Sequence, residues 1–528
     1  MRDNQYPGRS VVMSTRGMIA TSQPMATQAG LAVLKAGGNA MDAAIAASAV
    51  LCVTEPQSTG IGGDCFLLYH EAKTGKLHGL NGSGRAPARA TLEEFERRKL
   101  MQVPEFGILS VIVPGAVDAW QMALERFGTR RLEELLQPAI KYAEDGYAVT
   151  PVVAKSWKNL EPLLAQFPES RRDYLLDGHA PVTGTVHRHP RLAKSLREIA
   201  KNGRDAFYRG PIAEEIVRFS RAHDGLLELE DFSDYRSEWV EPIFTDYRGV
   251  RVHEIPPNGQ GITALMTLNI LEQAKLGEMT FLSADHLHLV IEAFKLAVAE
   301  RDEYVADPAC NKLPVEEMLS KEFAAKQYAR IDPRQAARYP IAPAARAQRD
   351  TVYLSVVDRD RNAVSFINSL YYPFGSGVVG GDTGIMLQNR GAGFVLEPGH
   401  FNCIAPRKRP LHTIIPAMAY RGDDILSFGV MGGDYQPMGH VYVLTNFLDF
   451  GLDLQEAIDA PRFQPGGGVV ALERPVPQDV LHALQQRGHV LGRTELSLGG
   501  AQAIYIDTKN GVLSAGSDPR KDGGALGY

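Results

Sequence analysis

A threonine at the start of an expected strand has the most distinctive chemical options in this 528-residue chain. Thr351 follows Asp350 and opens residues 351–357, where polar and apolar side chains alternate as in a strand. Residues 358–362 have turn composition and residues 363–367 are apolar, so the stretch predicts a β-hairpin. An ordinary hairpin in a large sheet is the simpler interpretation. The alternative is that cleavage before Thr351 turns this threonine into a nucleophile, and other parts of the sequence must decide between the two.

A helix expected over residues 283–300 carries side chains that can bind metals. His286, His288 and Glu292 could meet across about one helical turn. No third histidine stands at a supporting spacing, so a solvated helix face is the favoured interpretation. We therefore predict neither a metal nor another cofactor.

Residues 60–64 form a glycine-rich loop with the sequence GIGGD. Such loops can bind phosphate, but this one lacks the GK[ST] ending and precedes an expected strand at 65–70 instead of a helix. Tight backbone packing is therefore the favoured interpretation.

The helices and strands that position these residues come next. By its length, the chain could form several domains or one large body built around a sheet. Residues 150–235 are charged and helical and suit an outer layer, whereas residues 333–349 lack periodicity and predict an exposed linker leading to Asp350. Helices are expected at 24–37, 40–53, 91–99, 115–126, 132–145, 262–276, 441–450 and 454–460, and strands at 247–255, 384–389, 426–431, 501–507 and 512–518.

Composition excludes several classes of function. Apolar residues make up 44% and charged residues 22% of the chain, as in ordinary globular proteins. A net charge of −6 gives no indication of a basic surface that would bind nucleic acid or an anionic membrane. The N-terminus is polar and resembles no secretory signal, and the apolar run at 43–53 is too short to cross a bilayer. The four cysteines (Cys52, Cys65, Cys310 and Cys403) are scattered without a CxxC pair, which argues against a disulfide framework and fits a reducing compartment. We expect a cytoplasmic protein.

Eight short motifs are spread along the chain. They are LKAGGNAMDAA at 34–44, GIGG at 60–63, VPG at 113–115, DT at 350–351, FGSG at 374–377, KRPL at 408–411, GG at 432–433 and DPR at 518–520. None is specific alone, but in this order they resemble the γ-glutamyltransferase family from about residue 17 to the C-terminus.

The resemblance implies an N-terminal-nucleophile hydrolase of the α/β (α+β) class, with a four-layer αββα sandwich. Such a protein is made as one inactive chain that cuts itself, here between Asp350 and Thr351. Residues 1–350 would form a large subunit and residues 351–528 a small one, intertwined in one sandwich. The oligomeric state stays open, with a dimer of these heterodimers as one assembly.

The resemblance also assigns catalytic roles. The Thr351 hydroxyl would attack the Asp350 carbonyl, and hydrolysis of the ester would free an α-amino group whose reference pKa of about 7.7–8.0 suits a general base. Ser369 matches the hydroxyl partner of the nucleophile. Gly432 and Gly433 match the pair whose N–H groups hold the oxyanion, each typically worth about 3 kcal/mol, although a tight turn would equally explain two glycines.

The expected substrate pocket departs from the γ-glutamyl pattern. Ser83 replaces an arginine that binds the substrate carboxylate, and Tyr371 replaces an asparagine. Arg390 and Gly393 replace the glutamine and aspartate that bind the substrate ammonium. His412 and Thr413 replace a pair of serines. The acidic partner for an ammonium is therefore missing and a cation stands nearby. This favours a small anionic amide without an amino group, with Arg390 and Arg85 binding its carboxylate, unless these arginines form structural ion pairs.

The pattern resembles most the branch that holds oxamate amidohydrolase and acylases of the cephalosporin type. The segment between Phe394 and Lys408 is shorter than the lid that the resemblance implies over the pocket, which predicts an open pocket and hydrolysis over transpeptidation. We expect oxamate hydrolysis, implying nitrogen salvage from purine breakdown. The alternatives are glutaryl-type acyl amides, a γ-glutamyltransferase or glutathione hydrolase with a rearranged pocket, and an uncut binding protein.

Overall fold

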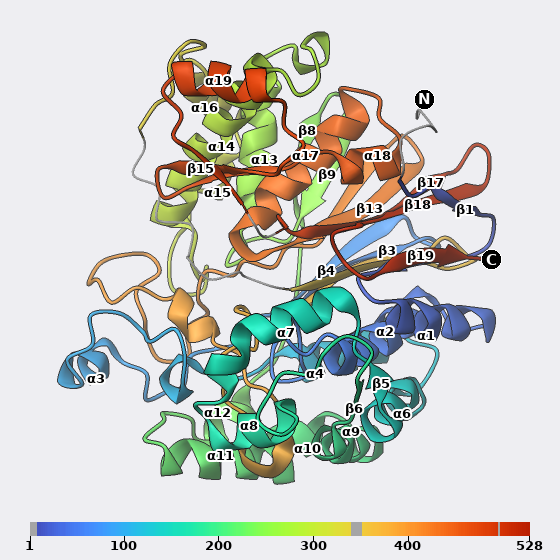
Figure 1. Cartoon of the computed structure of the whole chain (residues 1–528), viewed down its shortest axis with the longest axis vertical. Helices are drawn as coiled ribbons and strands as arrows, with labels where there is room; N and C mark the ends of the chain where they lie inside the picture. Colours follow the sequence, from blue (N-terminus) through green and yellow to red (C-terminus); the bar gives the residue numbers. More distant parts are fainter. Residues whose placement is uncertain (1–7, 339–350, 495–496) are drawn as a thin grey trace.

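Two seven-stranded sheets packed face to face form the centre of the molecule, and helices cover both outer faces (Figure 1). The structure is a computed structural model that describes residues 8–338, 351–494 and 497–528. Buried side chains fill the space between the two sheets and the space between each sheet and its helices. This is a four-layer αββα sandwich and confirms the predicted fold class.

The first sheet, called sheet A, lies in the upper half of Figure 1 and all its strand pairs are antiparallel. In spatial order it consists of β1 (Val12–Ser14), β18 (Val512–Ser517), β17 (Gly500–Asp507), β13 (Asp424–Met431), β12 (Ala417–Arg421), β9 (Val250–Glu254) and β8 (Ile243–Tyr247).

The second sheet, called sheet B, contains the hairpin that begins after Thr351. In spatial order it consists of β19 (Gly524–Gly527), β2 (Met18–Thr21), β10 (Val352–Val357), β11 (Ala363–Ser369), β3 (Asp64–Glu71), β4 (Lys76–Gly82) and β7 (Glu238–Val240). The pairing of β10 with β11 confirms the predicted hairpin.

Strand β10 is buried on both faces although its side chains alternate in polarity. Val352 and Leu354 join the core shared with the helices, while Tyr353 faces the space between the sheets. The polar positions are satisfied there, because Ser355 Oγ lies 2.7 Å from Ser427 Oγ of β13, and Tyr353 Oη lies 2.7 Å from Ser365 Oγ.

The helices form two outer layers, with the first twelve on the side of sheet B and the others on the side of sheet A (Figure 1). The first layer consists of α1 (Pro24–Lys35), α2 (Ala40–Thr54), α3 (Leu92–Arg97), α4 (Ala116–Phe127), α5 (Leu132–Leu135), α6 (Gln137–Asp145), α7 (Pro151–Leu164), α8 (Pro168–Tyr174), α9 (Pro190–Asn202), α10 (Arg204–Tyr208), α11 (Pro211–Ala222) and α12 (Leu229–Asp234). The second consists of α13 (Gly261–Leu271), α14 (Ala284–Tyr304), α15 (Val315–Met318), α16 (Lys321–Tyr328), α17 (Gln436–Leu448), α18 (Leu454–Asp459) and α19 (Gln478–Gln486).

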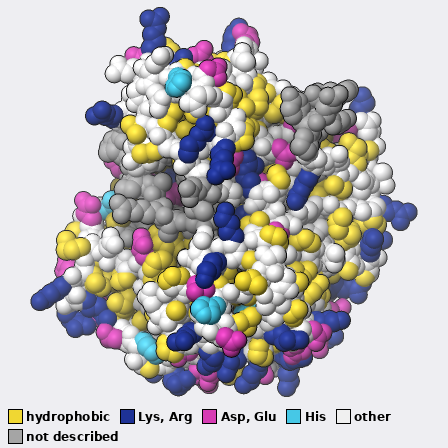
Figure 2. All heavy atoms as spheres, in the orientation of Figure 1, with side chains coloured by type: hydrophobic (Ala, Val, Ile, Leu, Met, Phe, Trp, Pro, Cys, Tyr) yellow, Lys and Arg dark blue, Asp and Glu magenta, His cyan; other side chains and the backbone are white. Residues whose placement is uncertain are grey.

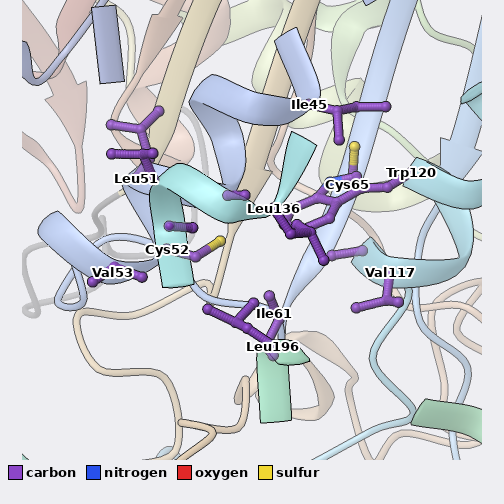
Figure 3. Packing of buried hydrophobic residues seen from close by; sticks show 14 of the residues in the cluster. Ile45, Leu51, Cys52, Val53, Ile61, Cys65, Val117, Trp120, Leu136 and Leu196 are labelled. Carbon is purple, nitrogen blue, oxygen red and sulfur yellow. The ribbon is translucent and has the colours of Figure 1, made fainter. Parts of the chain in front are cut away.

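The core under sheet B is organised around α2, whose fifteen residues are all buried. Its many alanines let it pack closely against α1 and against β10 and β11. Figure 3 shows Ile45 of α2, Cys65 of β3 and Trp120 of α4 in this cluster. The core thus fixes the position of the hairpin that carries Thr351.

Charged side chains mark the outer helices, as predicted for residues 150–235. Figure 2 shows Lys and Arg mixed with Asp and Glu over the lower part of the molecule, where α8 to α11 lie in Figure 1. Pairs such as Arg197 with Glu144 and Arg218 with Glu215 hold this surface. Exposed pairs of this kind add little stability but keep the layer solvated.

The structure corrects four predictions about elements. Residues 384–389 are buried but form only isolated bridges, and residues 247–255 belong to two strands, β8 and β9, joined by a turn. The helix expected at 132–145 is divided into α5 and α6. The solvated face predicted for His286, His288 and Glu292 is wrong, because all three are buried in α14.

Short peripheral sheets and the cysteines complete the fold. A three-stranded sheet contains β14 (Phe463–Gly466), β15 (Val469–Leu472) and β16 (Leu491–Arg493), and a two-stranded sheet contains β5 (Tyr147–Ala148) and β6 (Val186–His187).

All four cysteines are free, as predicted. In the described ranges, no helix combines the length and apolar character needed to cross a bilayer. Most of the predicted linker and the proposed cleavage residue Asp350 lie outside the described residues.

Candidate active site

Thr351 immediately precedes β10 and is buried with its hydroxyl group facing that of Ser369. The register pairs Val352 with Asn368, so Thr351 stands beside Ser369 at the end of β11. The two hydroxyl oxygens are 3.2 Å apart. The hairpin therefore brings the predicted nucleophile and its predicted partner into hydrogen-bond distance.

Tyr371 connects Ser369 to Arg390. Its backbone N–H donates to Ser369 Oγ at 2.9 Å, and its φ of +84° lies in the left-handed region, which is uncommon for a bulky residue. The ring then lies against the guanidinium of Arg390, with 4.1 Å between the Arg390 Cζ atom and the ring centroid. The turn after β11 thus aims Tyr371 at a buried cation.

Arg390 is completely buried in a 3₁₀ turn, Arg390–Gly393. Its Nη1 donates to Thr413 Oγ1 at 2.7 Å. Three predicted substrate residues that are far apart in the sequence, Tyr371, Arg390 and Thr413, are therefore in contact.

His412 is held by the carboxylate of Asp64, which was not among the predicted site residues. Its Nε2 lies 2.9 Å from Asp64 Oδ2, and its Nδ1 accepts the N–H of Ile414 at 3.3 Å. The neutral ring must therefore carry its hydrogen on Nε2. Burial, followed by the charge of Arg390, lowers the pKa of His412 to about 4, so the ring is neutral at pH 7.

Asp64 is itself fixed from two further directions. Its Oδ1 accepts the N–H of Gly115 at 3.0 Å and the side-chain amide of Gln388 at 2.8 Å. The glycine-rich loop before it packs as tightly as predicted, because a Cβ on Gly62 would stand 2.2 Å from the Met386 carbonyl oxygen. The loop therefore serves to place Asp64 under His412.

The glycine pair lies where β13 ends and a short turn leads into α17. Gly432 has a φ of +127° and Gly433 a φ of +56°, which glycine adopts at little cost. The side-chain amide of Gln260 donates to the carbonyl of Gly433 at 3.0 Å and to that of Thr413 at 2.7 Å. Arg301 donates to Gln260 Oε1 at 2.8 Å and so fixes the orientation of this amide.

The contacts join most of the predicted catalytic and substrate residues into one network, which does not include Arg85. They run from Thr351 through Ser369, Tyr371, Arg390 and Thr413 to Gln260 and Gly433. Asp64 and Gln260 were missed as site residues, although both stand in short glycine-containing motifs, GIGGD and PPNGQG. The sequence shows these motifs, but it does not show which distant residues their side chains contact.

Arg85 lies in a different setting from Arg390. It donates to Glu238 Oε1 at 2.8 Å and to the Arg407 carbonyl at 3.0 Å, and it lines a cavity of about 290 Å³ with Tyr235. The structure thus places Arg85 in an ion pair. Ser83, which is expected to replace the family's arginine, accepts a hydrogen bond from the side-chain amide of Asn258 at 2.9 Å.

The arrangement offers the parts needed for acyl transfer. Acyl transfer needs a nucleophile, backbone N–H donors for an oxyanion and a partner for the substrate. The buried hydroxyl pair, the glycine turn and the buried guanidinium are groups of these three kinds. The low dielectric of a buried site strengthens the hydrogen bonds and charge interactions that such groups make.

Comparisons with known proteins agree with this chemistry. The family model described as gamma-glutamyltranspeptidase matches residues 26–528. The chain is 39% identical to the glutathione hydrolase-like YwrD proenzyme of Bacillus subtilis, over 98% of this chain and 99% of that protein. It is 35% identical to the oxamate amidohydrolase proenzyme of Klebsiella pneumoniae, again over 98% and 99%. The crystal structure of cephalosporin acylase from Bacillus halodurans superposes with a TM-score of 0.92 at 44% identity, covering 100% of this chain and 99% of the other.

Proposed function

Because this chain belongs to the γ-glutamyltranspeptidase family of N-terminal-nucleophile enzymes that act on amide bonds, we propose that it is a self-cleaving amidohydrolase with Thr351 as nucleophile. The observation that carries the proposal is the 3.2 Å contact between Thr351 Oγ1 and Ser369 Oγ at the start of β10. Structural threonines are common, but this one is buried beside a second hydroxyl and connected to a buried arginine.

Self-cleavage would use the same hydroxyl as catalysis. Oγ1 of Thr351 attacks the carbonyl carbon of Asp350, the peptide C–N bond breaks, and water hydrolyses the resulting ester. The products are a carboxylate on Asp350 and a free α-amino group on Thr351. That amine has a reference pKa of about 7.7–8.0 and is the general base for the next reaction.

Catalysis then follows on the cut chain. The amine of Thr351 takes the hydroxyl proton as Oγ1 attacks the substrate carbonyl, and the N–H groups of Gly432 and Gly433 bind the oxyanion. The amine returns the proton to the leaving nitrogen, which departs as ammonia or an amine. Water then hydrolyses the acyl ester on Thr351.

We propose a small amide that carries a carboxylate, with oxamate as the preferred candidate and oxalate and ammonia as products. Arg390 would bind the carboxylate, with Tyr371 against its face and Thr413 at its edge. Neutral His412 adds no second positive charge beside Arg390, which supports a substrate with a single carboxylate. The 35% identity to an oxamate amidohydrolase proenzyme supports this assignment.

An acylase acting on a bulkier acyl amide is the second candidate. The 44% identity and full-length match to a cephalosporin acylase favour it. A γ-glutamyl substrate fits less well, since Arg390 and Gly393 offer its ammonium no carboxylate.

Denaturing electrophoresis tests the nucleophile. We expect two fragments from the wild type, divided between residues 350 and 351, and a single chain from Thr351→Ala. A single band from both proteins would disprove self-cleavage and favour an uncut binding protein. Two fragments from both proteins would show that cleavage does not require Thr351.

Product release from a panel of amides tests the substrate. The cut protein should release ammonia from oxamate faster than it releases product from a glutaryl amide or a γ-glutamyl anilide. A preference for the glutaryl amide would favour the acylase, and release from the anilide alone would favour a γ-glutamyl enzyme.

A further inference from the structure

A second cluster of chemically reactive side chains is buried in the layer above sheet A. His288 and Glu292 belong to α14, and His489 follows α19. Their exposed fractions are 2%, 0% and 5%, respectively, and one ligand atom from each lies within 4.8 Å of the other two. In the described part of the chain, no other group of three or more histidine, cysteine, aspartate or glutamate residues meets this condition.

The ring of His288 is oriented like that of a metal ligand. Its Nε2 lies 2.8 Å from the backbone carbonyl oxygen of Asp332, which can only accept, so Nε2 carries the hydrogen. The lone pair of Nδ1 therefore faces His489 Nε2, which is 2.8 Å away. A carbonyl that fixes the far N–H in this way is the usual support for a metal-binding histidine.

His489 can adopt the matching protonation state. Without a metal, its Nε2 must donate a hydrogen to His288, and its Nδ1 has no hydrogen-bond partner among the described residues. Moving the hydrogen from Nε2 to Nδ1 would leave two imidazole lone pairs facing the same point. Zinc binds neutral imidazoles through such lone pairs.

The ammonium group of Lys295 lies against the carboxylate of this cluster. Lys295 Nζ lies 2.7 Å from Glu292 Oε1, and the second oxygen, Oε2, accepts the N–H of Ala337 at 3.0 Å. Lys295 and His489 both line a cavity of about 310 Å³. The lysine side chain therefore has space to move away from Glu292, and water has a route to the two histidines.

We propose that His288 Nδ1, His489 Nε2 and the Glu292 carboxylate bind one divalent ion of the zinc class, with water from the cavity as the fourth ligand. The ion replaces the Lys295 ammonium at Glu292, and two imidazoles with one carboxylate are a common zinc donor set. Because α14 precedes Thr351 and His489 follows it, the ion would also join the two fragments of a cut chain. The metal site itself does not depend on the proposed cleavage or on the proposed substrate.

Metal binding to untagged protein that has been dialysed against a chelator tests the site. The wild type should bind one equivalent of Zn²⁺, and Co²⁺ in its place should give the strong visible absorption of a four-coordinate ion. His288→Ala and His489→Ala should each weaken Zn²⁺ binding by more than about 100-fold, beyond the 10- to 100-fold effect of losing an outer-shell partner. Lys295→Met should bind Zn²⁺ at least about tenfold more tightly, because the competing ammonium is gone.

His187→Ala is the matched control. His187 Nε2 lies 2.9 Å from His189 Nε2, so this pair repeats the contact between two rings, and both are buried. The control should bind Zn²⁺ like the wild type. Equal affinity in the wild type, His288→Ala and His489→Ala would overturn the proposal. If the alanine variants fail to fold, Lys295→Met decides, since an unchanged affinity in that variant contradicts displacement of its ammonium.

Discussion

Burial determines how much each polar contact in the candidate active site contributes. Arg390 is completely buried, against the ring of Tyr371 and within hydrogen-bond distance of Thr413. A charge in such a place is costly unless fixed partners or a bound anion compensate for it. The proposed carboxylate substrate would add an anion to these contacts, whereas a neutral amide would not.

Replacing Arg390 by Gln should separate binding from chemistry. The variant loses a charge-assisted contact worth about 1.5–3 kcal/mol, so we expect KM for oxamate to rise by about 10- to 100-fold. Self-cleavage involves no external carboxylate, so its rate should change much less. Steady-state kinetics and the time course of fragment formation measure the two effects.

Arg85→Gln is the comparison for this variant. Arg85 is paired with Glu238 and 26% of its side chain is exposed, so its loss should change KM by less than about threefold. An equal rise of KM in both variants would show that Arg85 also binds substrate. If self-cleavage in Arg390→Gln slows by as large a factor as KM rises, Arg390 is instead structural.

The sequence predicted the residue types of the site better than their partners. Thr351, Ser369 and the glycine pair came from motifs, and the structure brings them into one network. The support of His412 by Asp64 joins residues 348 positions apart, and no local pattern encodes such a contact. The contact of His288 with His489 was likewise not predictable, because only tertiary packing brings these two residues together.

At the scale of elements, the loop before β3 fixes the end of the hairpin formed by β10 and β11. The carbonyl oxygen of Gly63 accepts the N–H groups of Gly115 and Ala116, at 3.0 and 2.9 Å. A Cβ added to Gly63 would stand 2.2 Å from the carbonyl oxygen of Ser369. The loop and the strand end therefore have no room for a side chain between them.

Gly63→Ala should destabilise the protein and displace Ser369. Overpacking of this kind typically costs about 1–3 kcal/mol, so we expect a lower melting temperature together with lower amidohydrolase activity. Gly524→Ala is the control, because a Cβ on Gly524 of β19 meets no atom within 4 Å. Its melting temperature should stay close to that of the wild type, and a similar loss in both variants would contradict the packing argument.

Strands and hairpins could be predicted where polar and apolar residues alternate and where the turn contains residues that are common in turns. The hairpin of β10 and β11 met both conditions. The hairpin of β8 and β9 was missed because Arg248 and Gly249 form its turn, with φ values of +52° and +76°, and Arg-Gly is a weaker turn signal than Asn-Gly. Residues 384–389 are apolar because they are buried, and the isolated bridges that hold them leave no periodic pattern.

At the scale of the whole molecule, the chain order explains how a cut protein could stay together. In sheet B, β10 and β11 follow Thr351 but lie between β2 and β3, which precede it. In sheet A, β1 and β9 precede Thr351 and flank four strands that follow it. Separating the proposed fragments would therefore break both sheets, so cleavage should leave the sandwich intact.

Buried histidines predict how the stability of the whole molecule depends on pH. Burial lowers the pKa of His187 to about 4 from its ordinary 6.5, and burial with the Arg390 charge does the same for His412. Between these two pKa values the unfolded chain binds a proton at each histidine and the folded chain does not. Stability is therefore fully present above about pH 6.5 and falls as the pH decreases towards 4.

Each such histidine should reduce the free energy of unfolding by about 2 kcal/mol between pH 7 and pH 5. We expect the melting temperature to fall over this range, and the His187→Gln variant to show a smaller fall than the wild type. His179→Gln is the control, because 77% of the His179 side chain is exposed. Thermal melting of the three proteins at pH 7, 6 and 5 measures the difference. A fall of equal size in all three would mean that His187 does not contribute, and that other groups cause the acid sensitivity.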